Sequence, residues 1–290
     1  MTMHSYSDLI VCPKCKGQIK FINEKNYRCS KCGLLIPAID GKLVFTPPPK
    51  NIIPFEKRSR GPEMGTPWRK ANWAFLKKQI SNLKDDAAIL DVGAGRGDFL
   101  DLYKDKHHIA LDIYPYPEVD VVCDLLNVVP FKESSFNMVL LMNVLEHVYN
   151  PLDLLSVIKY LLKPDGYIVI AIPFMLKIHQ KPYDFGRYTH FALKKFAEEL
   201  NLNVYKLEGF YDPAGLINET VRYFKFWVNP KKSLMKRAIS SIFLTVINKT
   251  ASLMKRFIIS SYVKDSESEN YPAPIGYHVV YVKSLDQEVH

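Results

Sequence analysis

The stretch AAILDVGAGRGD, residues 87–98, decides the fold of this chain. Its first seven residues are an apolar run that ends in glycine, which predicts a short buried strand over 87–93. The glycines that follow let the backbone turn sharply and pass close to a ligand. A strand, a glycine-rich turn and the opening of a helix indicate an α/β fold with a ligand site at the turn.

Outward from this stretch, residues 68–290 alternate helix and strand, as in an α/β domain with a mostly parallel sheet. Apolar spacings of three and four residues predict helices at 68–83, 151–162 and 191–200. Apolar runs predict six further strands, at 108–114, 119–125, 136–143, 167–173, 203–210 and 277–283. The result is a seven-stranded sheet, with a mostly helical insertion at about 213–270 before the last strand.

Four cysteines near the start form two CxxC pairs, Cys12 with Cys15 and Cys29 with Cys32, separated by 13 residues. Four thiolates at this spacing can enclose one zinc ion and leave no coordination position for water, so the site is predicted to be structural. We therefore expect a zinc ribbon over 1–45 that folds only with its metal, followed by a proline-rich, basic linker over 46–67.

Charge is unevenly distributed along the chain. Residues 1–60 hold 11 Lys and Arg against 4 Asp and Glu, 61–220 hold 17 against 21, and 221–290 hold 11 against 5. Basic flanks suit a polyanionic partner, and they equally serve as ordinary solubilising charge. We find no secretory leader and no apolar run long enough for a transmembrane helix. The paired cysteines suit a metal rather than disulfides and indicate a reducing compartment. Together these features predict a cytoplasmic protein.

The glycine turn differs from a dinucleotide fingerprint, which would place its third glycine where this chain has Asp98. Acidic residues at 91 and 98 are poorly suited to a pyrophosphate and suit a cofactor that carries a sulfonium and an ammonium group. The pattern Asp91-Val-Gly93-Ala-Gly95-Arg-Gly97 resembles motif I of class I S-adenosylmethionine (SAM)-dependent methyltransferases.

Further motifs follow in the order of that family. Asp112 ends the second strand, where an acid can accept hydrogen bonds from both ribose hydroxyls. The segment 142–148, MNVLEHV, resembles a motif of the methyltransferase type 11 group, and 161–173 resembles its next motif. The resemblance covers about 86–210 and implies a Rossmann-like methyltransferase. The implied cofactor-binding residues are Asp91, Gly93, Gly95, Gly97, Asp112, Asp124, Leu125 and Asn143.

The N-terminal module carries a second resemblance. The sequence CPKCKG, with CGLLIPAIDGKLVF over 32–45, is similar to small zinc-ribbon proteins that activate tRNA and protein methyltransferases. A similar ribbon precedes a family of ribosomal-RNA guanine methyltransferases. The resemblance therefore implies two alternatives for this chain: an RNA methyltransferase that binds RNA through its basic ribbon, or a non-catalytic activating partner of another methyltransferase.

Two groups of residues could act on the acceptor. His147 follows the fourth strand, at the edge where substrate and cofactor meet in such folds, although it could equally be a helix-start residue packed on the sheet. Residues 179–189, HQKPYDFGRYT, resemble a segment of type 11 methyltransferases linked to surface-polysaccharide biosynthesis. The alternative is an ordered loop in which Asp184 pairs with Arg187 and Thr189 caps the next helix.

We therefore expect methyl transfer to a hydroxylated acceptor, either a small molecule or a glycan, and in particular a sugar or lipid-linked glycan. His147 or His179 would accept the hydroxyl proton. Asp184 would orient the imidazole or bind substrate hydroxyls, and Arg187 would hold an anionic group of the acceptor. The acceptor atom and the oligomeric state stay open at this point.

An apolar stripe with five cationic residues runs along residues 234–258 at helical spacing. The simplest interpretation is a helix packed on its own domain. The alternative is a basic amphipathic surface that lies on a membrane, which would place the protein peripherally at the inner face of that membrane.

Overall fold

The fold is given by a computed structural model. It describes residues 8–50, 65–213, 215–217, 241–243, 245–247, 249–250, 262–265 and 274–284.

All seven strands expected from the sequence are present. They are β5 (Ala88–Val92), β6 (His107–Asp112), β7 (Val121–Val122), β8 (Phe136–Met142), β9 (Leu162–Pro173), β10 (Leu202–Tyr211) and β12 (Gly276–Lys283). Their order across the sheet is β7-β6-β5-β8-β9-β12-β10. Neighbouring strands from β7 to β9 pair in parallel, whereas β12 is antiparallel to both β9 and β10.

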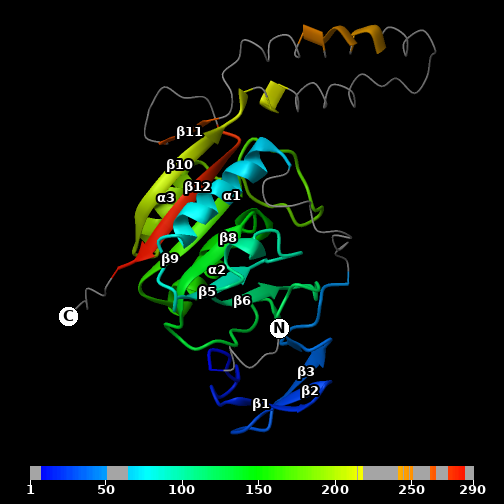
Figure 1. The fold of residues 1–290 in the computed structure, drawn as a ribbon, viewed down its shortest axis with the longest axis vertical. Helices are drawn as coiled ribbons and strands as arrows, with labels where there is room; N and C mark the ends of the chain where they lie inside the picture. The colour runs from blue at the N-terminus through cyan, green and yellow to red at the C-terminus, as the bar shows by residue number, and fades with distance from the viewer. Residues whose placement is uncertain are drawn as a thin grey trace.

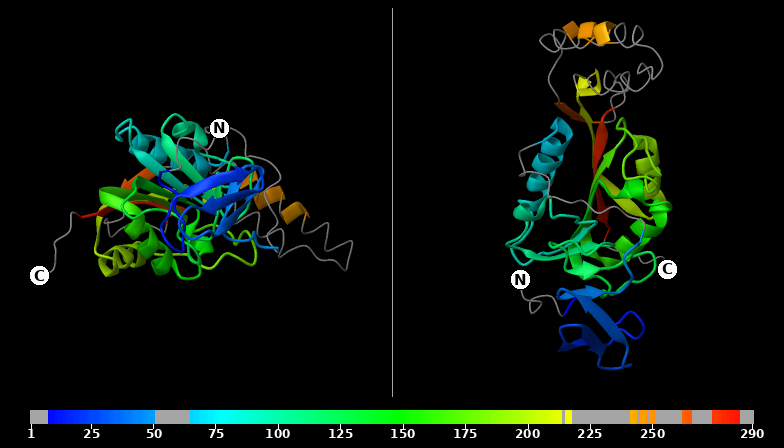
Figure 2. Two further views of the ribbon diagram at one scale, coloured as in Figure 1. Left: turned by 90° about the horizontal axis from the view of Figure 1, so that it is seen from below. Right: turned by 90° about the vertical axis from the view of Figure 1, so that its right-hand side faces the viewer.

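Three α-helices cover this sheet: α1 (Pro67–Ile80) on one face, and α2 (Pro151–Leu161) with α3 (His190–Glu199) on the other (Figure 2). Successive side chains of a strand point alternately toward the two helical layers. Met138 and Leu140 of β8 pack in the cluster that includes α1, and Val139 and Leu141 pack in the cluster that includes α2 and α3. Burial on both faces explains why β8 is a continuous apolar run with no polar alternation.

The helix expected directly after the glycine turn is present only as the short 3-10 helix η2 (Leu100–Leu102). Gly93, Gly95 and Gly97 all have positive φ, between 54° and 73°. This left-handed conformation cannot continue into a right-handed helix, so the turn extends for several residues before η2 begins.

The sheet is larger than the seven strands predicted. Strands β1 (Ile19–Asn23), β2 (Asn26–Cys29), β3 (Leu35–Ile39) and β4 (Lys42–Val44) of the N-terminal module continue it at one edge, and β11 (Tyr262–Asp265) continues it at the other (Figure 1). β11 lies inside the insertion that was predicted to be mostly helical. It is a strand because it pairs antiparallel with the exposed edge of β10.

The N-terminal module is joined to the α/β domain by backbone pairing. β4 pairs in parallel with β7, and the Val11 amide donates to the Pro130 carbonyl at 2.8 Å. The segment expected to be a linker takes part as well, because the Thr46 hydroxyl accepts a hydrogen bond from the Asp124 amide at 2.8 Å. Residues 51–64 of that segment lie outside the described residues.

Most of the amphipathic segment 234–258 also lies outside the described residues. Residues 241–243, 245–247 and 249–250 are helical, and Ile242, Phe243 and Val246 are exposed. Within the part of the chain that the structure describes, no helix is both long and apolar enough to span a bilayer.

Candidate cofactor and acceptor site

The glycine turn lies between β5 and β8 at their carboxyl ends, where the strand order reverses and α/β folds bind ligands. The Gly93 and Ala94 amides donate to the Leu111 carbonyl at 2.8 and 3.0 Å, which fixes the turn against β6. A Cβ added to Gly93 would lie 2.6 Å from a methyl group of Val144. Glycine at this position therefore serves close packing as well as conformation.

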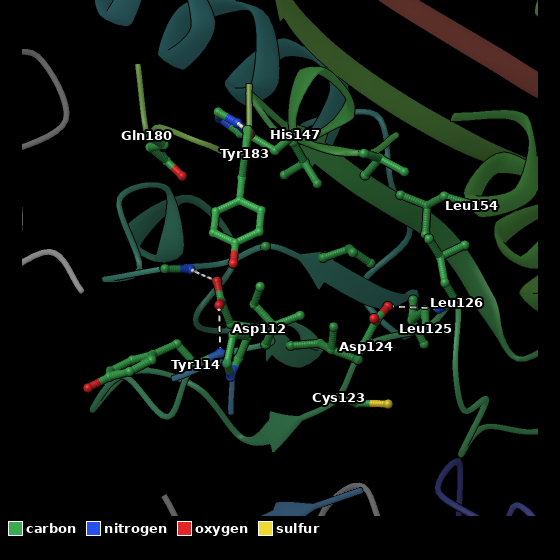
Figure 3. A pocket seen from close by; sticks show the side chains of 18 of the residues that line it. Asp112, Tyr114, Cys123, Asp124, Leu125, Leu126, His147, Leu154, Gln180 and Tyr183 are labelled. Atoms are coloured by element: carbon green, nitrogen blue, oxygen red, sulfur yellow. Dashed lines mark hydrogen bonds between the residues drawn. The ribbon is translucent and has the colours of Figure 1, made fainter. Parts of the chain in front are cut away.

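A cavity of about 360 Å³ opens beside this turn (Figure 3). Its walls come from the carboxyl ends of the strands and from the loop after β9, and they include most of the predicted cofactor residues. Among the described residues that line it, none is Lys or Arg, while Asp112 and Asp124 are acidic. This composition disfavours a pyrophosphate and suits a neutral or cationic nucleoside cofactor.

Asp112 stands at the end of β6 with its carboxylate facing the cavity (Figure 3). Its two oxygens accept hydrogen bonds from the Gly95 and Tyr114 amides, both at 2.9 Å. Burial raises the pKa of this carboxyl group. Each carboxylate oxygen has a second lone pair, so the group can also accept hydrogen bonds from ribose hydroxyls.

Asp124 and Leu125, which were predicted to lie at the adenine end, also line the cavity. The Asp124 carboxylate is engaged within its own turn, where it accepts from the Leu126 amide at 3.0 Å and from the Asn127 side chain at 2.6 Å. Leu125 is buried and contributes an apolar wall. Asp124 thus shapes the turn, and its contact to a cofactor stays a prediction.

A second cavity, of about 560 Å³, lies on the other side of the turn and shares Gly93, Gly95 and Asn143 with the first. Asp91 lines it and receives a hydrogen bond from the Tyr103 hydroxyl. Burial raises the pKa of Asp91 to about 7.

Asp98 also lines this second cavity, and the structure pairs it with Arg69 at 2.7 Å. Asn143 has φ of 58°, and its side-chain oxygen accepts from the Trp68 indole at 3.1 Å. This bond connects α1 to the end of β8.

Gly97 does not line either cavity. Its Cβ, if present, would lie 3.1 Å from Glu118, so its role in the turn is steric.

Residues 179–189 form an internally braced loop over the two cavities. Arg187 binds both oxygens of Asp184, at 2.5 and 2.9 Å, and also donates to the backbone carbonyls of Gly186 and Lys177. Burial opposes ionisation of Asp184, but hydrogen bonds from Arg187 and from the His179 amide lower its pKa to about 2. The Thr189 hydroxyl accepts from the Ala192 amide and caps α3. Arg187 thus braces the loop in this structure.

The structure brings the two predicted histidines together, although 32 positions separate them in the chain. The His147 and His179 rings meet edge to face with centroids 4.7 Å apart. His147 follows β8 in the 3-10 helix η3 (Leu145–His147) and lines the first cavity, whereas His179 lines the second. Burial lowers the pKa of His147, which favours its neutral imidazole.

Sequence reasoning missed three residues at this site. Glu146 is fully buried between the histidines, and burial raises its pKa to about 8. Gln180 lines both cavities, and Tyr183 extends from the loop across the first cavity toward Asp112 (Figure 3). Glu146 could have been found from its position between a buried strand and His147, within the motif that was recognised.

The four cysteines of the N-terminal module also meet. The Cys12 and Cys32 sulfurs are 3.6 Å apart, the Cys15 and Cys29 sulfurs are 3.4 Å apart, and all four lie within 4.8 Å of one another. Two sulfurs bound to one zinc ion in a tetrahedron lie about 3.8 Å apart. The cluster therefore has the dimensions of a four-cysteine zinc site.

Comparison with known proteins agrees with this geometry. Residues 68–207 match the family model described as "Methyltransferase domain". A curated relative, an uncharacterized protein of Methanocaldococcus jannaschii, is 37% identical over 106 residues, which are 34% of this chain and 46% of the relative. The chain thus spans about half the length of that relative.

Solved methyltransferase structures are similar at lower identity. One is a SAM-dependent methyltransferase from Archaeoglobus fulgidus, at 22% identity and a TM-score of 0.45, covering 74% of this chain and 94% of that chain. Another is a complex of the Haloferax volcanii Trm112 methyltransferase activator with a methyltransferase, at 16% identity and a TM-score of 0.46, covering 74% and 92%. Residues 68–207 are thus similar to the methyltransferase domain family, and the predicted Rossmann-like α/β fold is confirmed.

Proposed function

We propose that this protein is a SAM-dependent methyltransferase that acts on a hydroxylated acceptor, a sugar or a lipid-linked glycan. The observation that carries the proposal is the position of His147 and His179, which meet where the two cavities adjoin the glycine turn. A sugar hydroxyl is a poor nucleophile at neutral pH, so groups that help remove its proton matter more than they would for an amine or thiol.

The cavity residues fit the cofactor. Asp112 would accept the ribose hydroxyls, Leu125 would pack on the adenine, and the glycine turn would pass under the ligand. Asp91 faces the second cavity, where a carboxylate suits the cofactor's ammonium group. When bound, SAM supplies a methyl carbon that is activated by a positive sulfur, so the protein mainly positions the acceptor oxygen and removes its proton.

The braced loop would position one histidine. The His179 Nδ1 atom lies 3.2 Å from Asp184, which in turn is held by Arg187. A carboxylate that holds one imidazole nitrogen leaves the other free for the acceptor. Arg187 would then act through Asp184 as a positioning residue.

We further propose that Cys12, Cys15, Cys29 and Cys32 hold a structural zinc ion. The module that carries them also supports a second candidate acceptor, RNA, because Lys20, Lys25 and Arg28 are exposed on its β1–β2 hairpin. The third alternative, a non-catalytic activating role, would be supported if the purified chain failed to bind SAM.

The test is to incubate extracts with the purified protein and SAM labelled in its methyl group, and to identify labelled products by mass spectrometry. Labelled carbohydrate or lipid-linked glycan is the expected result. Labelled RNA as the sole product would establish the second candidate, and the absence of any label together with no SAM binding would contradict both and support the third.

A further inference from the structure

Three side chains bring potential metal-ligand atoms close together: Glu146 and His147, which follow β8, and His179, from the loop after β9. The Glu146 Oε1 atom lies 3.8 Å from His147 Nε2 and 3.7 Å from His179 Nε2, and one ligand atom from each residue lies within 4.8 Å of the others. These separations are too long for hydrogen bonds. We refer to these three residues as the Glu–His cluster.

The tautomers of the two histidines follow from their other ring nitrogens. His147 Nδ1 lies 2.5 Å from the Tyr183 carbonyl oxygen, and His179 Nδ1 lies 3.2 Å from the Lys177 carbonyl oxygen and from Asp184. Carbonyl and carboxylate oxygens only accept, so each Nδ1 carries the proton. Each Nε2 therefore presents a lone pair toward Glu146.

Burial makes this arrangement costly without a cation. Glu146 is fully buried, and neither of its carboxylate oxygens has a hydrogen-bond partner; the buried His147 Nε2 also has none. An uncompensated buried carboxylate is strongly unfavourable. Protonation of Glu146 would remove the charge but would leave its atoms and the His147 Nε2 without a hydrogen-bond partner, whereas one positive ion would satisfy them together.

The geometry points to such an ion. We propose that Glu146, His147 and His179 bind one divalent transition-metal cation, such as Zn²⁺, Mn²⁺ or Fe²⁺. Two histidines and one carboxylate are a recurrent ligand set for these metals. Ligand atoms about 2.1 Å from a tetrahedral ion lie about 3.4 Å apart, so the two distances from Glu146 to the histidines would shorten by only a few tenths of an ångström on binding the ion.

The surroundings of the cluster match those of metal-binding histidines. Such histidines usually donate their second ring nitrogen to a carboxylate or a backbone carbonyl, which fixes the ring and its tautomer. Here the Tyr183 carbonyl serves His147, and Asp184, held in place by Arg187, serves His179. In this proposal, the hydrogen bonds that brace the loop also hold His179 in position to bind the ion.

Three protein ligands leave coordination positions open toward the cavities that His147 and His179 line. A hydroxyl bound at an open position would have a lower pKa and would release its proton to water more readily. In this arrangement the imidazoles act as ligands, and the metal activates the acceptor. This role rests on the proposed function, whereas metal binding itself does not.

The test uses the full-length protein with its four-cysteine site already filled with zinc. Mn²⁺ is a suitable probe because it prefers nitrogen and oxygen ligands over thiolates. Binding is measured by loss of the free Mn²⁺ electron paramagnetic resonance signal, and a calorimetric titration with further Zn²⁺ provides a second readout. We expect one additional site per chain, with affinity reduced about 100-fold or more in His179→Ala and Glu146→Gln.

The matched control is His107→Ala, because His107 begins β6 at the opposite, amino edge of the sheet and should leave metal binding unchanged. SAM binding in each variant confirms that the domain is folded. Absence of a second site for both metals, or equal affinity in wild type and His179→Ala, would overturn the proposal. If the metal binds but no hydroxylated acceptor is methylated, the metal site stands and the proposed acceptor is wrong. If a hydroxylated acceptor is methylated but no second metal binds, the proposed acceptor stands and the metal site is wrong.

Discussion

The ribbon and the carboxyl edge of the sheet are built in opposite ways. In the ribbon, four cysteines from a span of 21 residues close on one another within a locally folded module. At the carboxyl edge, Asp91, Asp112, Glu146 and His179 come from separate segments that only the sheet brings together, and the cavities there stay open. A closed cluster of this kind is expected to stabilise the fold, while an open one is expected to bind ligands. Substitutions in the ribbon should therefore reduce stability, and substitutions at the carboxyl edge should reduce binding or turnover.

The largest effect is expected in the ribbon. Cys12→Ser removes one of the four proposed zinc ligands, and binding of a structural zinc contributes about 10 kcal/mol or more to the folding of such modules. We expect loss of zinc by metal analysis and loss of hydrogen-exchange protection over residues 9–46. Because β4 pairs with β7, protection at that edge of the sheet should fall too. A variant that retains full protection without zinc would contradict a structural role.

At the carboxyl edge, Asp112→Ala should weaken SAM binding by about 100-fold, since it leaves two ribose hydroxyls without their acceptor. Calorimetry measures the affinity, and thermal unfolding of the variant without ligand checks that folding is retained. Asp101→Ala, at an exposed position in the 3-10 helix η2, is the control and should bind normally. Tighter binding of NAD than of SAM by the wild type would overturn the cofactor assignment.

How far the sequence predicted these two regions follows from the range of the interactions. The cysteine cluster and the strands β5, β8 and β9 depend on local spacing and apolar runs, so they were predicted with their residues. Addition of the ribbon strands to the sheet depends on pairing between residues 43–44 and 121–122, which no local pattern indicates. β11 was missed for the same reason, because pairing with β10 overrides the helical pattern of its surroundings.

The candidate site divides in the same way. The glycine turn and Asp112 were found because they follow strands at recognisable spacings. The position of Glu146 at the site was missed because it depends on burial between His147 and a loop 32 residues away. The pairing of Asp98 with Arg69 was also unforeseen, since Arg69 belongs to α1 and lies 29 residues earlier in the chain than Asp98.

A smaller effect concerns pH. Burial raises the pKa of Asp91 from an ordinary value of 3.8 to about 7 in the folded protein. The folded state therefore binds more protons than the unfolded state between these values, so this residue makes stability fall as pH rises from about 4 to 7. In Asp91→Asn, chemical denaturation across this range should show a flatter dependence on pH. An unchanged slope would show that Asp91 ionises normally.

The smallest effect is expected outside both regions. The exposed side chains of Ile242, Phe243 and Val246 lie in the segment 234–258, with cationic residues nearby in the sequence. If this segment meets a membrane, the protein should co-float with anionic liposomes, and high salt should reduce the co-flotation. Neutral liposomes are the control. No co-flotation, or co-flotation unaffected by salt, counts against an electrostatic membrane contact.

The most direct test of the open, chemical nature of the carboxyl edge is methyl transfer by His179→Ala, measured with labelled SAM and a hydroxylated glycan acceptor while SAM affinity is measured in parallel. We predict that turnover falls about 10²- to 10⁴-fold and that SAM affinity stays close to that of the wild type, because His179 is not one of the residues proposed to hold the cofactor and does not line the cavity that contains Asp112. Full activity in the variant, or an equal loss of SAM binding and turnover, would contradict the account.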